Sequence, residues 1–247
     1  MSNHEITSKR IFQDLLVRTL FCSASALTLV ALIASCCIAS AESGPPPDYK
    51  LNTDPDLAFT SPDGATKLMQ YKKETEDYDI KWQVWARHGE QMSELKPEQD
   101  YPAGFRFTND SQWLVRMQKT GAGYQDLHLY HFEKGGFANA TKKPLSELAW
   151  DFFNSLPDAK TISPPDFHIS ADLLKGTEEA YRWLGVNWPD NRYIVISLSG
   201  EIEAKHPKNG VRWLHGWRCR YDLKSGKFDV PGVFAKGNAE ALKRTER

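Results

Sequence analysis

Carboxylates next to aromatic residues are the first side chains in this sequence whose types and spacing suggest chemistry. A glycosidase needs two carboxylates at a set separation beside rings on which a sugar can stack. The segment from residue 178 to 203 offers both, with rings at Tyr181, Trp183 and Trp188. The candidate carboxylates are Glu178, Glu179, Asp190, Glu201 and Glu203. Aromatic residues on short strands also serve to pack hairpins, so this site is an alternative.

Arginines form the second candidate site. Arg212, Arg218 and Arg220 hold even positions of residues 211–223, where the odd positions are mostly apolar. Successive side chains of a strand point to opposite faces, so these arginines are predicted to share one face. Together with Arg192 they would form a stripe that binds an anionic polymer or a lipid head group. A solvated strand face with local ion pairs is the alternative interpretation.

The odd positions of the same stretch predict its buried face. They include Trp213, Trp217, Cys219 and Tyr221, so Cys219 is expected to be a buried, unreactive thiol. Gly216 interrupts the run and marks either a bulge or the turn of a hairpin. The other residues predicted for the core are Trp82, Val84, Trp113, Val115, Leu127, Leu129 and Val195.

Other catalytic patterns do not occur in the sequence. There is no H-E-x-x-H, no C-x-x-C and no G-x-S-x-G motif. His128 and His131 are three apart on an expected strand, which points them to opposite faces and prevents shared metal binding. We therefore predict no metal site, no cofactor and no catalytic residue. Whether the protein is an enzyme stays open, and the sequence favours one that is not.

The N-terminal segment has the three parts of a secretory signal peptide. Lys9, Arg10 and Arg18 precede residues 19–41, which carry no charge. That run ends in a small-x-small pattern at Ala39 and Ala41, which predicts cleavage after residue 41.

Two other fates of this segment remain open. The residues before Cys36 resemble a lipobox, which would make Cys36 the lipidated first residue of a lipoprotein. The run is also long enough to stay as a single membrane anchor. All three fates place residues 42–247 outside the cytoplasm, in the periplasm or at the cell surface. The membrane is reached only through an uncleaved or lipidated N-terminus.

Composition argues against two classes of protein, disordered proteins and nucleic-acid-binding proteins. Of 247 residues, 40% are hydrophobic and 12% aromatic, which argues against wholesale disorder. The charges nearly balance, with 31 Lys and Arg against 32 Asp and Glu. A nucleic-acid partner is therefore not expected, because binding nucleic acid usually requires a basic field.

The exported part is predicted to be one mainly β domain. Residues 42–56 are rich in Pro and Asp and indicate an extended linker, and residues 57–247 form the domain. Asp63, Asp110 and Asp190 each sit in a turn just before an apolar strand, which divides the domain into three hairpin or meander units. A helical insertion is expected at about 142–184, with an amphipathic helix over 145–156 and a second over 177–184.

Two of these turns resemble a known type of repeat. The motifs S-P-D-G at Ser61 and F-T-N-D-S-x-W-L-V at Phe107 resemble blade hairpins of TolB-like and WD40-like β-propellers. The resemblance extends to small exported bacterial proteins that carry such hairpins in a partial meander. It implies export and β structure, and implies no activity. Three units are too few for a closed propeller, so the expected architecture is an incomplete propeller or a sandwich-like fold.

These observations favour a non-catalytic binding or interaction module, with an envelope protein or polymer as its partner. Two alternatives remain open. One is an exported hydrolase of carbohydrate or another envelope polymer. The other is a periplasmic inhibitor of an envelope-degrading enzyme, which would insert a loop into its partner's cleft.

Overall fold

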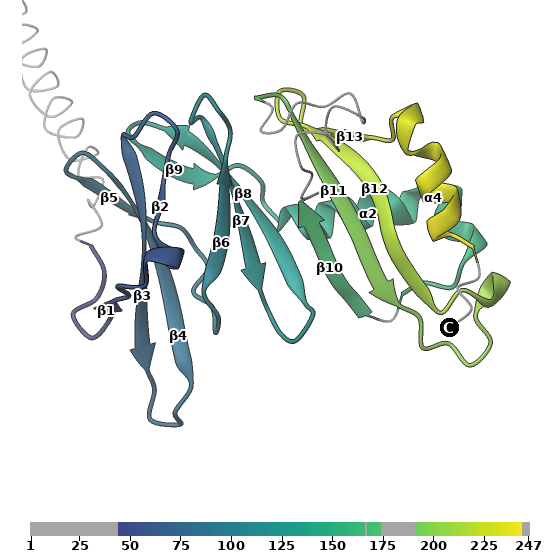
Figure 1. Ribbon diagram of the computed structural model, residues 1–247, viewed down its shortest axis with the longest axis horizontal. Coiled ribbons are helices and arrows are strands. Elements are labelled where there is room, and N and C mark those ends of the chain that lie inside the picture. The colour runs from purple at the N-terminus through teal and green to yellow at the C-terminus, as the bar shows by residue number, and fades with distance from the viewer. Residues whose placement is uncertain (1–43, 166, 174–190, 244–247) are drawn as a thin grey trace, which may run out of the picture. The chain divides into compact units, whose positions relative to one another are not determined.

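The computed structural model describes residues 44–165, 167–173 and 191–243 (Figure 1). The chain divides into two units, Met1–Ser43 and Gly44–Arg247, and the description below concerns the second. The predicted signal peptide, with Ala39, Ala41 and Cys36, lies outside the described residues. No helix within the described part of the chain is long and apolar enough to cross a membrane.

The fold is mainly β and consists of three antiparallel meanders of four strands each. The first contains β2 (Phe59–Thr60), β3 (Thr66–Glu74), β4 (Ile80–His88) and β5 (Gln91–Glu94). The second contains β6 (Ala103–Phe107), β7 (Trp113–Lys119), β8 (Gln125–Glu133) and β9 (Gly136–Asn139). The third contains β10 (Phe167–Leu173), β11 (Tyr193–Glu201), β12 (Trp213–Asp222) and β13 (Lys227–Asp229). The prediction of a mainly β fold with three meander units is confirmed.

The meanders form two sheets. In the first meander, β1 (Lys50–Leu51) also pairs with β3, which gives a five-stranded sheet. The second and third meanders join into an eight-stranded sheet through a short parallel pairing of β8 with β10, at Gln125 and Ser170. Neither sheet closes into a barrel over the described residues.

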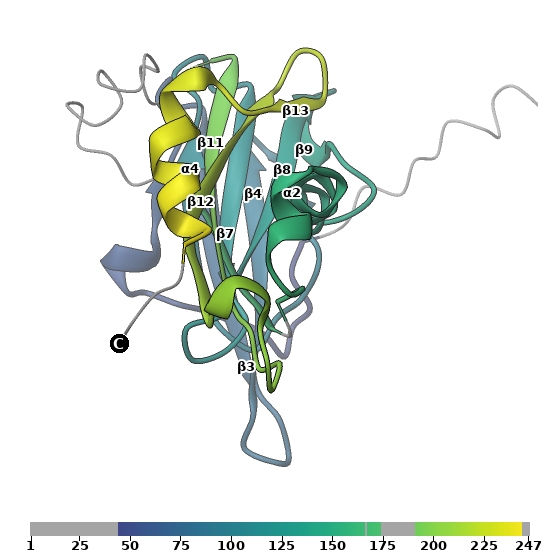
Figure 2. The same ribbon diagram turned by 90° about the vertical axis from the view of Figure 1, so that its right-hand side faces the viewer.

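Among the described residues, two α-helices accompany the third meander, on opposite faces of β12 (Figure 2). They are α2 (Leu145–Ser155) and α4 (Ala235–Ala241). The predicted helix over 145–156 is confirmed as α2, which starts after Pro144 and ends before Pro157, because proline disrupts a helix interior. Short 3-10 turns occur at Pro55–Leu57, Asp158–Thr161, Lys208–Gly210 and Gly232–Phe234.

The expected helical insertion is only partly helical. Strand β10 lies within residues 142–184 and forms the first strand of the third meander. In the first two meanders the strand before the aspartate turn belongs to the unit, and β10 holds the corresponding place in the third, whereas the sequence prediction began each unit at the turn. The second predicted helix, over 177–184, lies outside the described residues.

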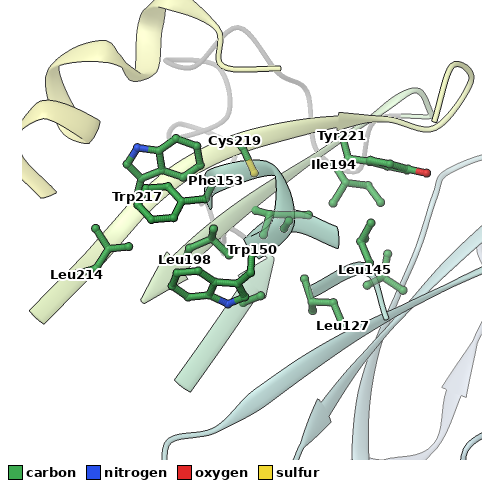
Figure 3. Close-up of a cluster of buried hydrophobic side chains, with 14 of the residues drawn as sticks. Leu127, Leu145, Trp150, Phe153, Ile194, Leu198, Leu214, Trp217, Cys219 and Tyr221 are labelled. Atoms are coloured by element: carbon green, nitrogen blue, oxygen red, sulfur yellow. The ribbon is translucent and has the colours of Figure 1, made fainter. Parts of the chain in front are cut away.

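Two hydrophobic clusters hold the meanders together. The first joins the first two meanders and includes Leu68, Phe105 and Leu114. The second joins the other two meanders and α2, and Figure 3 shows part of it, including Phe153 and Trp217. The central meander is therefore covered on both faces, which explains why β7 is buried along most of its length.

A bulge in β12 corrects the predicted burial pattern. Leu198 pairs with Trp217, but Ser199 pairs with His215, and Gly216 is left between them at φ +74°. Glycine adopts this left-handed backbone without a steric penalty. Before the bulge the faces are exchanged, so Leu214 is buried beside Trp217 and Trp213 is not in the core (Figure 3).

Of the other residues predicted for the core, all but one are buried. Trp113 is also only half-buried, because its ring lies 4.3 Å from the ring of His131 near the surface. Cys219 is fully buried as predicted. The remaining predicted core residues are confirmed: Trp82, Val84, Val115, Leu127, Leu129, Val195, Trp217 and Tyr221.

The aspartate turns at Asp63 and Asp110 are built alike. In the second, Asp110 Oδ1 accepts the Thr108 hydroxyl at 2.6 Å and the Gln112 N–H at 3.1 Å. In the first, Asp63 Oδ1 accepts the Ser61 hydroxyl at 2.5 Å and the Ala65 N–H at 3.0 Å. Each carboxylate thus replaces backbone partners within its own turn, as short polar side chains do in tight turns.

The turns are also joined in series. The Asp63 N–H donates to Ser111 Oγ at 3.2 Å, and the Asp110 N–H donates to Asn191 Oδ1 at 3.1 Å. In both links the acceptor follows the aspartate of the next turn along the chain. This repeated hydrogen bond fixes the three meanders at one end of their second strands.

Candidate ligand-binding cleft on the third meander

A cleft of about 440 Å³ lies between the third meander and α4. Its floor comes from two neighbouring strands, β11 and β12, and α4 forms one wall. The lining residues are Ser197, Ser199, Trp213, His215, Gly216, Arg218, Gly237, Glu240 and Ala241. We refer to this site as the Arg218 cleft.

The bulge at Gly216 determines which side chains of β12 face this cleft. Ser197 pairs with Arg218 across the two strands, and Ser199 pairs with His215. Directly opposed residues of an antiparallel pair share a face of the sheet. Without the extra residue, His215 and Trp213 would lie on the face of Trp217, inside the core. The bulge brings an aromatic ring and an imidazole to the same face as a guanidinium group.

Hydrogen bonds prepare the imidazole and one hydroxyl to act as donors. The Trp213 indole N–H donates to His215 Nδ1 at 3.4 Å, so the neutral imidazole carries its proton on Nε2. Ser199 Oγ accepts the Gly216 N–H at 3.1 Å, which leaves its own proton available. The cleft therefore presents polar N–H and O–H groups beside the half-buried Trp213 ring.

Arg218 is held firmly by the helix that covers it. Buried Asn238 of α4 accepts the Arg218 N–H at 2.8 Å, and its amide donates to the Arg218 carbonyl at 2.8 Å. The Arg218 Nε atom is buried and has no hydrogen-bond partner among the described residues. Arg218 forms no ion pair with any described residue, although the Glu240 carboxylate lines the same cleft.

The other predicted arginines lie elsewhere. Arg220 forms two hydrogen bonds with Asp229, at 2.9 and 2.5 Å, and Arg192 contacts Asp222 at 3.1 Å. Both guanidinium groups lie over the ring of Tyr193, at 4.1 and 4.9 Å from its centre. These contacts are typical of an ion-pair network that stabilises a strand surface.

The pKa shifts of Asp222 and Arg192 agree with their place in this ion-pair network. The hydrogen bond from Arg192, together with the N–H groups of Lys224 and Ser225, lowers the pKa of Asp222 to about 2. The pKa of Arg192 is raised in return. Arg212 is exposed, lies before β12, and donates to the Ala204 carbonyl at 3.5 Å. Of the four predicted arginines, the structure places Arg218 alone in the cleft.

The predicted carboxylates are not gathered around it. Glu201 is exposed at the end of β11, opposite Trp213, and is not among the residues that line the cleft. Glu203 is exposed two residues later. Glu178, Glu179 and Asp190 lie outside the described residues. Glu240, which sequence reasoning missed, lines the cleft because α4 folds over β12.

Metal and thiol chemistry have no geometric support in this cleft. Over the ranges that the structure describes, no cluster of three or more His, Cys, Asp or Glu side chains is placed to hold a metal ion. Burial raises the pKa of the Cys219 thiol, which lies on the core face of β12 and away from Arg218. The cleft brings together one guanidinium group, one carboxylate from Glu240, several neutral donors and one aromatic surface.

Comparisons with known proteins add little to this description. No protein-family model matches the chain, and no curated protein matches it. One solved structure, described as the AtxE2 isopeptidase in its apo form, is similar with a TM-score of 0.33 and 11% sequence identity. The match covers 77% of this chain and 30% of the other. At that level the likeness carries no inference about fold or activity.

Proposed function

We propose that this protein is an exported, non-catalytic binding module that acts in the periplasm or at the cell surface. Its partner is an acidic polysaccharide of the cell envelope, and the Arg218 cleft holds one carboxylate-bearing sugar. The meanders are proposed to be three blades of an incomplete propeller, which serve as a rigid support for the cleft.

One observation carries this proposal. The bulge at Gly216 places Trp213 and His215 on the same face as Arg218, around one cleft. A guanidinium group recognises a carboxylate with two parallel hydrogen bonds. The neutral donors of His215 and Ser199 suit the hydroxyls of a sugar, and the Trp213 ring offers a surface for its apolar face. Together these groups match a uronic acid in each of its chemical parts.

Calorimetric titration of the purified protein with a uronic acid oligosaccharide tests the ligand. The matched ligand control is the same oligosaccharide with its carboxyl groups reduced to alcohols. We expect saturable binding of the acidic form, and at least about tenfold weaker binding of the reduced form, because a charged hydrogen bond contributes about 1.5–3 kcal/mol.

The variant Arg218→Gln should lose the same preference. Arg212→Gln is the matched control, because Arg212 is exposed, lies on the same segment and does not line the cleft. Equal binding of the acidic and reduced oligosaccharides, or undiminished binding by Arg218→Gln, would exclude this ligand class.

Export is tested separately, by mass spectrometry of the mature N-terminus from the periplasmic fraction. A protein recovered with Met1 in the cytoplasmic fraction would contradict it.

A further inference from the structure

A second cleft, of about 260 Å³, lies on the second meander and shares no lining residue with the Arg218 cleft. It is bounded by the loop after β5, by β8 and by the segment that leads into α2. The lining residues are Lys96, Pro97, His128, Leu129, Asn139, Thr141, Lys142, Lys143 and Pro144. We refer to it as the His128 cleft.

A buried imidazole in the wall of this cleft lacks a partner. His128 is only 9% exposed, and its Nε2 atom forms no hydrogen bond with any described residue. A buried polar atom without a partner costs about 1–3 kcal/mol, so such atoms are uncommon, and a bound water or ion is one explanation for them. Because His128 lines the cleft, a group that enters there is able to supply the missing partner.

A buried cation lies directly behind His128. Arg116 pairs with His128 across β7 and β8 and is completely buried. Its Nη1 donates to the carbonyls of Leu95 and Pro97, at 2.6 and 2.8 Å. Its Nη2 has no hydrogen-bond partner among the described residues. The backbone oxygens hold the guanidinium group in place but do not neutralise its charge.

The acidic groups around this cation are few and already engaged. Glu94 of β5 is the carboxylate whose charge reaches Arg116, and it contacts Lys96 at 3.6 Å. Asp126 of β8 acts on His128 from the same strand and accepts the Ser146 hydroxyl at 3.0 Å. These two carboxylates balance the positive charges of Arg116 and Lys96 in the inner part of the cleft.

The rim of the cleft carries two lysines, one without an ion pair among the described residues and one engaged by two carboxylates. Lys142 is exposed and forms no ion pair with any described residue, while Lys143 contacts Glu147 at 2.6 Å and Asp151 at 3.3 Å. Helix α2 begins immediately afterwards, and its N-cap residue, Pro144, makes no side-chain hydrogen bond to the first turn. The N-terminus of a helix attracts anions through its unpaired N–H groups and its dipole.

We propose that the His128 cleft binds a phosphate group. A multiply charged oxyanion would accept hydrogen bonds from the His128 ring and from Lys142, next to the N-terminus of α2 and the charge of Arg116. The source of the group is either free phosphate or a phosphomonoester carried by a larger molecule. This site is independent of the Arg218 cleft and adds a second ligand to a binding module.

Calorimetric titration of the purified protein with inorganic phosphate and with glycerol phosphate tests the site, with acetate as the control anion. We expect saturable phosphate binding that Lys142→Gln weakens by about tenfold, through the loss of one charged hydrogen bond. Lys67→Gln is the matched control, because Lys67 is an exposed lysine of the first meander that forms no ion pair with any described residue, and this variant should bind phosphate as the wild type does. Tighter binding of glycerol phosphate would identify a phosphomonoester as the source, and tighter binding of inorganic phosphate would identify the free ion.

A second measurement follows His128 itself. Burial and the charge of Arg116 lower the pKa of His128 to about 4 in the free protein. A bound phosphate should raise this pKa, which an NMR titration of the imidazole signals measures with and without phosphate. The charged groups that act on the ring or line its cleft are Arg116, Asp126, Lys96, Lys142 and Lys143, so only a shift that saturates in step with phosphate binding is assigned to the bound ion. Absence of saturable binding, equal binding of acetate, or an unchanged pKa of His128 at saturating phosphate would overturn the proposal.

Discussion

The His128 imidazole links the stability of the fold to pH. Burial lowers its pKa from 6.5 to about 4, with a further contribution from Arg116. Between these values the unfolded chain binds a proton that the folded chain does not, so this contribution to stability is complete above pH 6.5 and is lost as the pH falls towards 4. We predict a loss of roughly 2–3 kcal/mol between pH 7 and pH 4.5 from this group, measured by urea unfolding.

The control for this prediction is the variant His128→Asn. Several carboxylates with lowered pKa, including Asp63 and Asp222, also make the protein less stable in acid. The difference between wild type and variant isolates the imidazole. A variant that loses as much stability as the wild type over this pH range would contradict the assignment.

Substitutions of Leu214 and Trp213 test whether the bulge exchanges the buried and exposed faces of β12. Leu214 is fully buried and Trp213 is half-buried on the cleft face. We predict that Leu214→Ala costs about 2–5 kcal/mol of unfolding free energy, as buried leucines do. Trp213→Ala should cost less, although tryptophan is the larger side chain. An unbroken alternation along β12 predicts the reverse order, so chemical denaturation of the two variants distinguishes the two arrangements.

The aspartate turns can be tested at the scale of the element. Asp110 accepts one hydroxyl and one backbone N–H, and its own N–H links the second turn to Asn191 of the third. We predict that Asp110→Ala destabilises the protein by about 1–2 kcal/mol, the effect of losing comparable side-chain acceptors. Asp110→Asn keeps the accepting oxygen and should cost less, as measured by thermal unfolding. Equal losses of stability in both variants would show that the accepting oxygen of Asp110 does not account for the stabilisation.

The elements that the sequence predicted well are those with local signals. The helix over 145–156 follows from its own 3.6-residue periodicity and from the two prolines beside it. The strands after Asp63 and Asp110 follow from adjacent turn residues. Cys219 was placed correctly because it lies after the bulge, where the predicted alternation holds.

The elements that the sequence did not predict depend on distant contacts. Strand β10 pairs with β11, which begins 20 residues after β10 ends, and α4 packs on β12 across the intervening β13. Gly216 was identified as a bulge or a turn, but only pairing with β11 decides between them and exchanges Leu214 with Trp213. The Arg218 cleft depends on both the bulge and α4, which is why the predicted arginine stripe gave one of its residues and none of the others.

The central meander links the two outer meanders, so the described unit is expected to unfold as a whole. It shares one hydrophobic cluster with the first meander and another with the third, and the turn hydrogen bonds follow the same order. We predict a single cooperative unfolding transition. Substituting Trp82 in the first meander or Trp217 in the third with a fluorescent analogue should give the same denaturation midpoint. Two separate midpoints would show that the outer meanders unfold independently.

The measurement that tests the central claim most directly is an NMR titration with a uronic acid oligosaccharide. The indole N–H of Trp213 lies in the Arg218 cleft, while Trp217, four residues later, is buried on the opposite face. A binding module of the proposed kind predicts that the Trp213 signal shifts saturably and the Trp217 signal does not move. An unchanged Trp213 signal at ligand concentrations where the protein is saturated would contradict the proposed cleft.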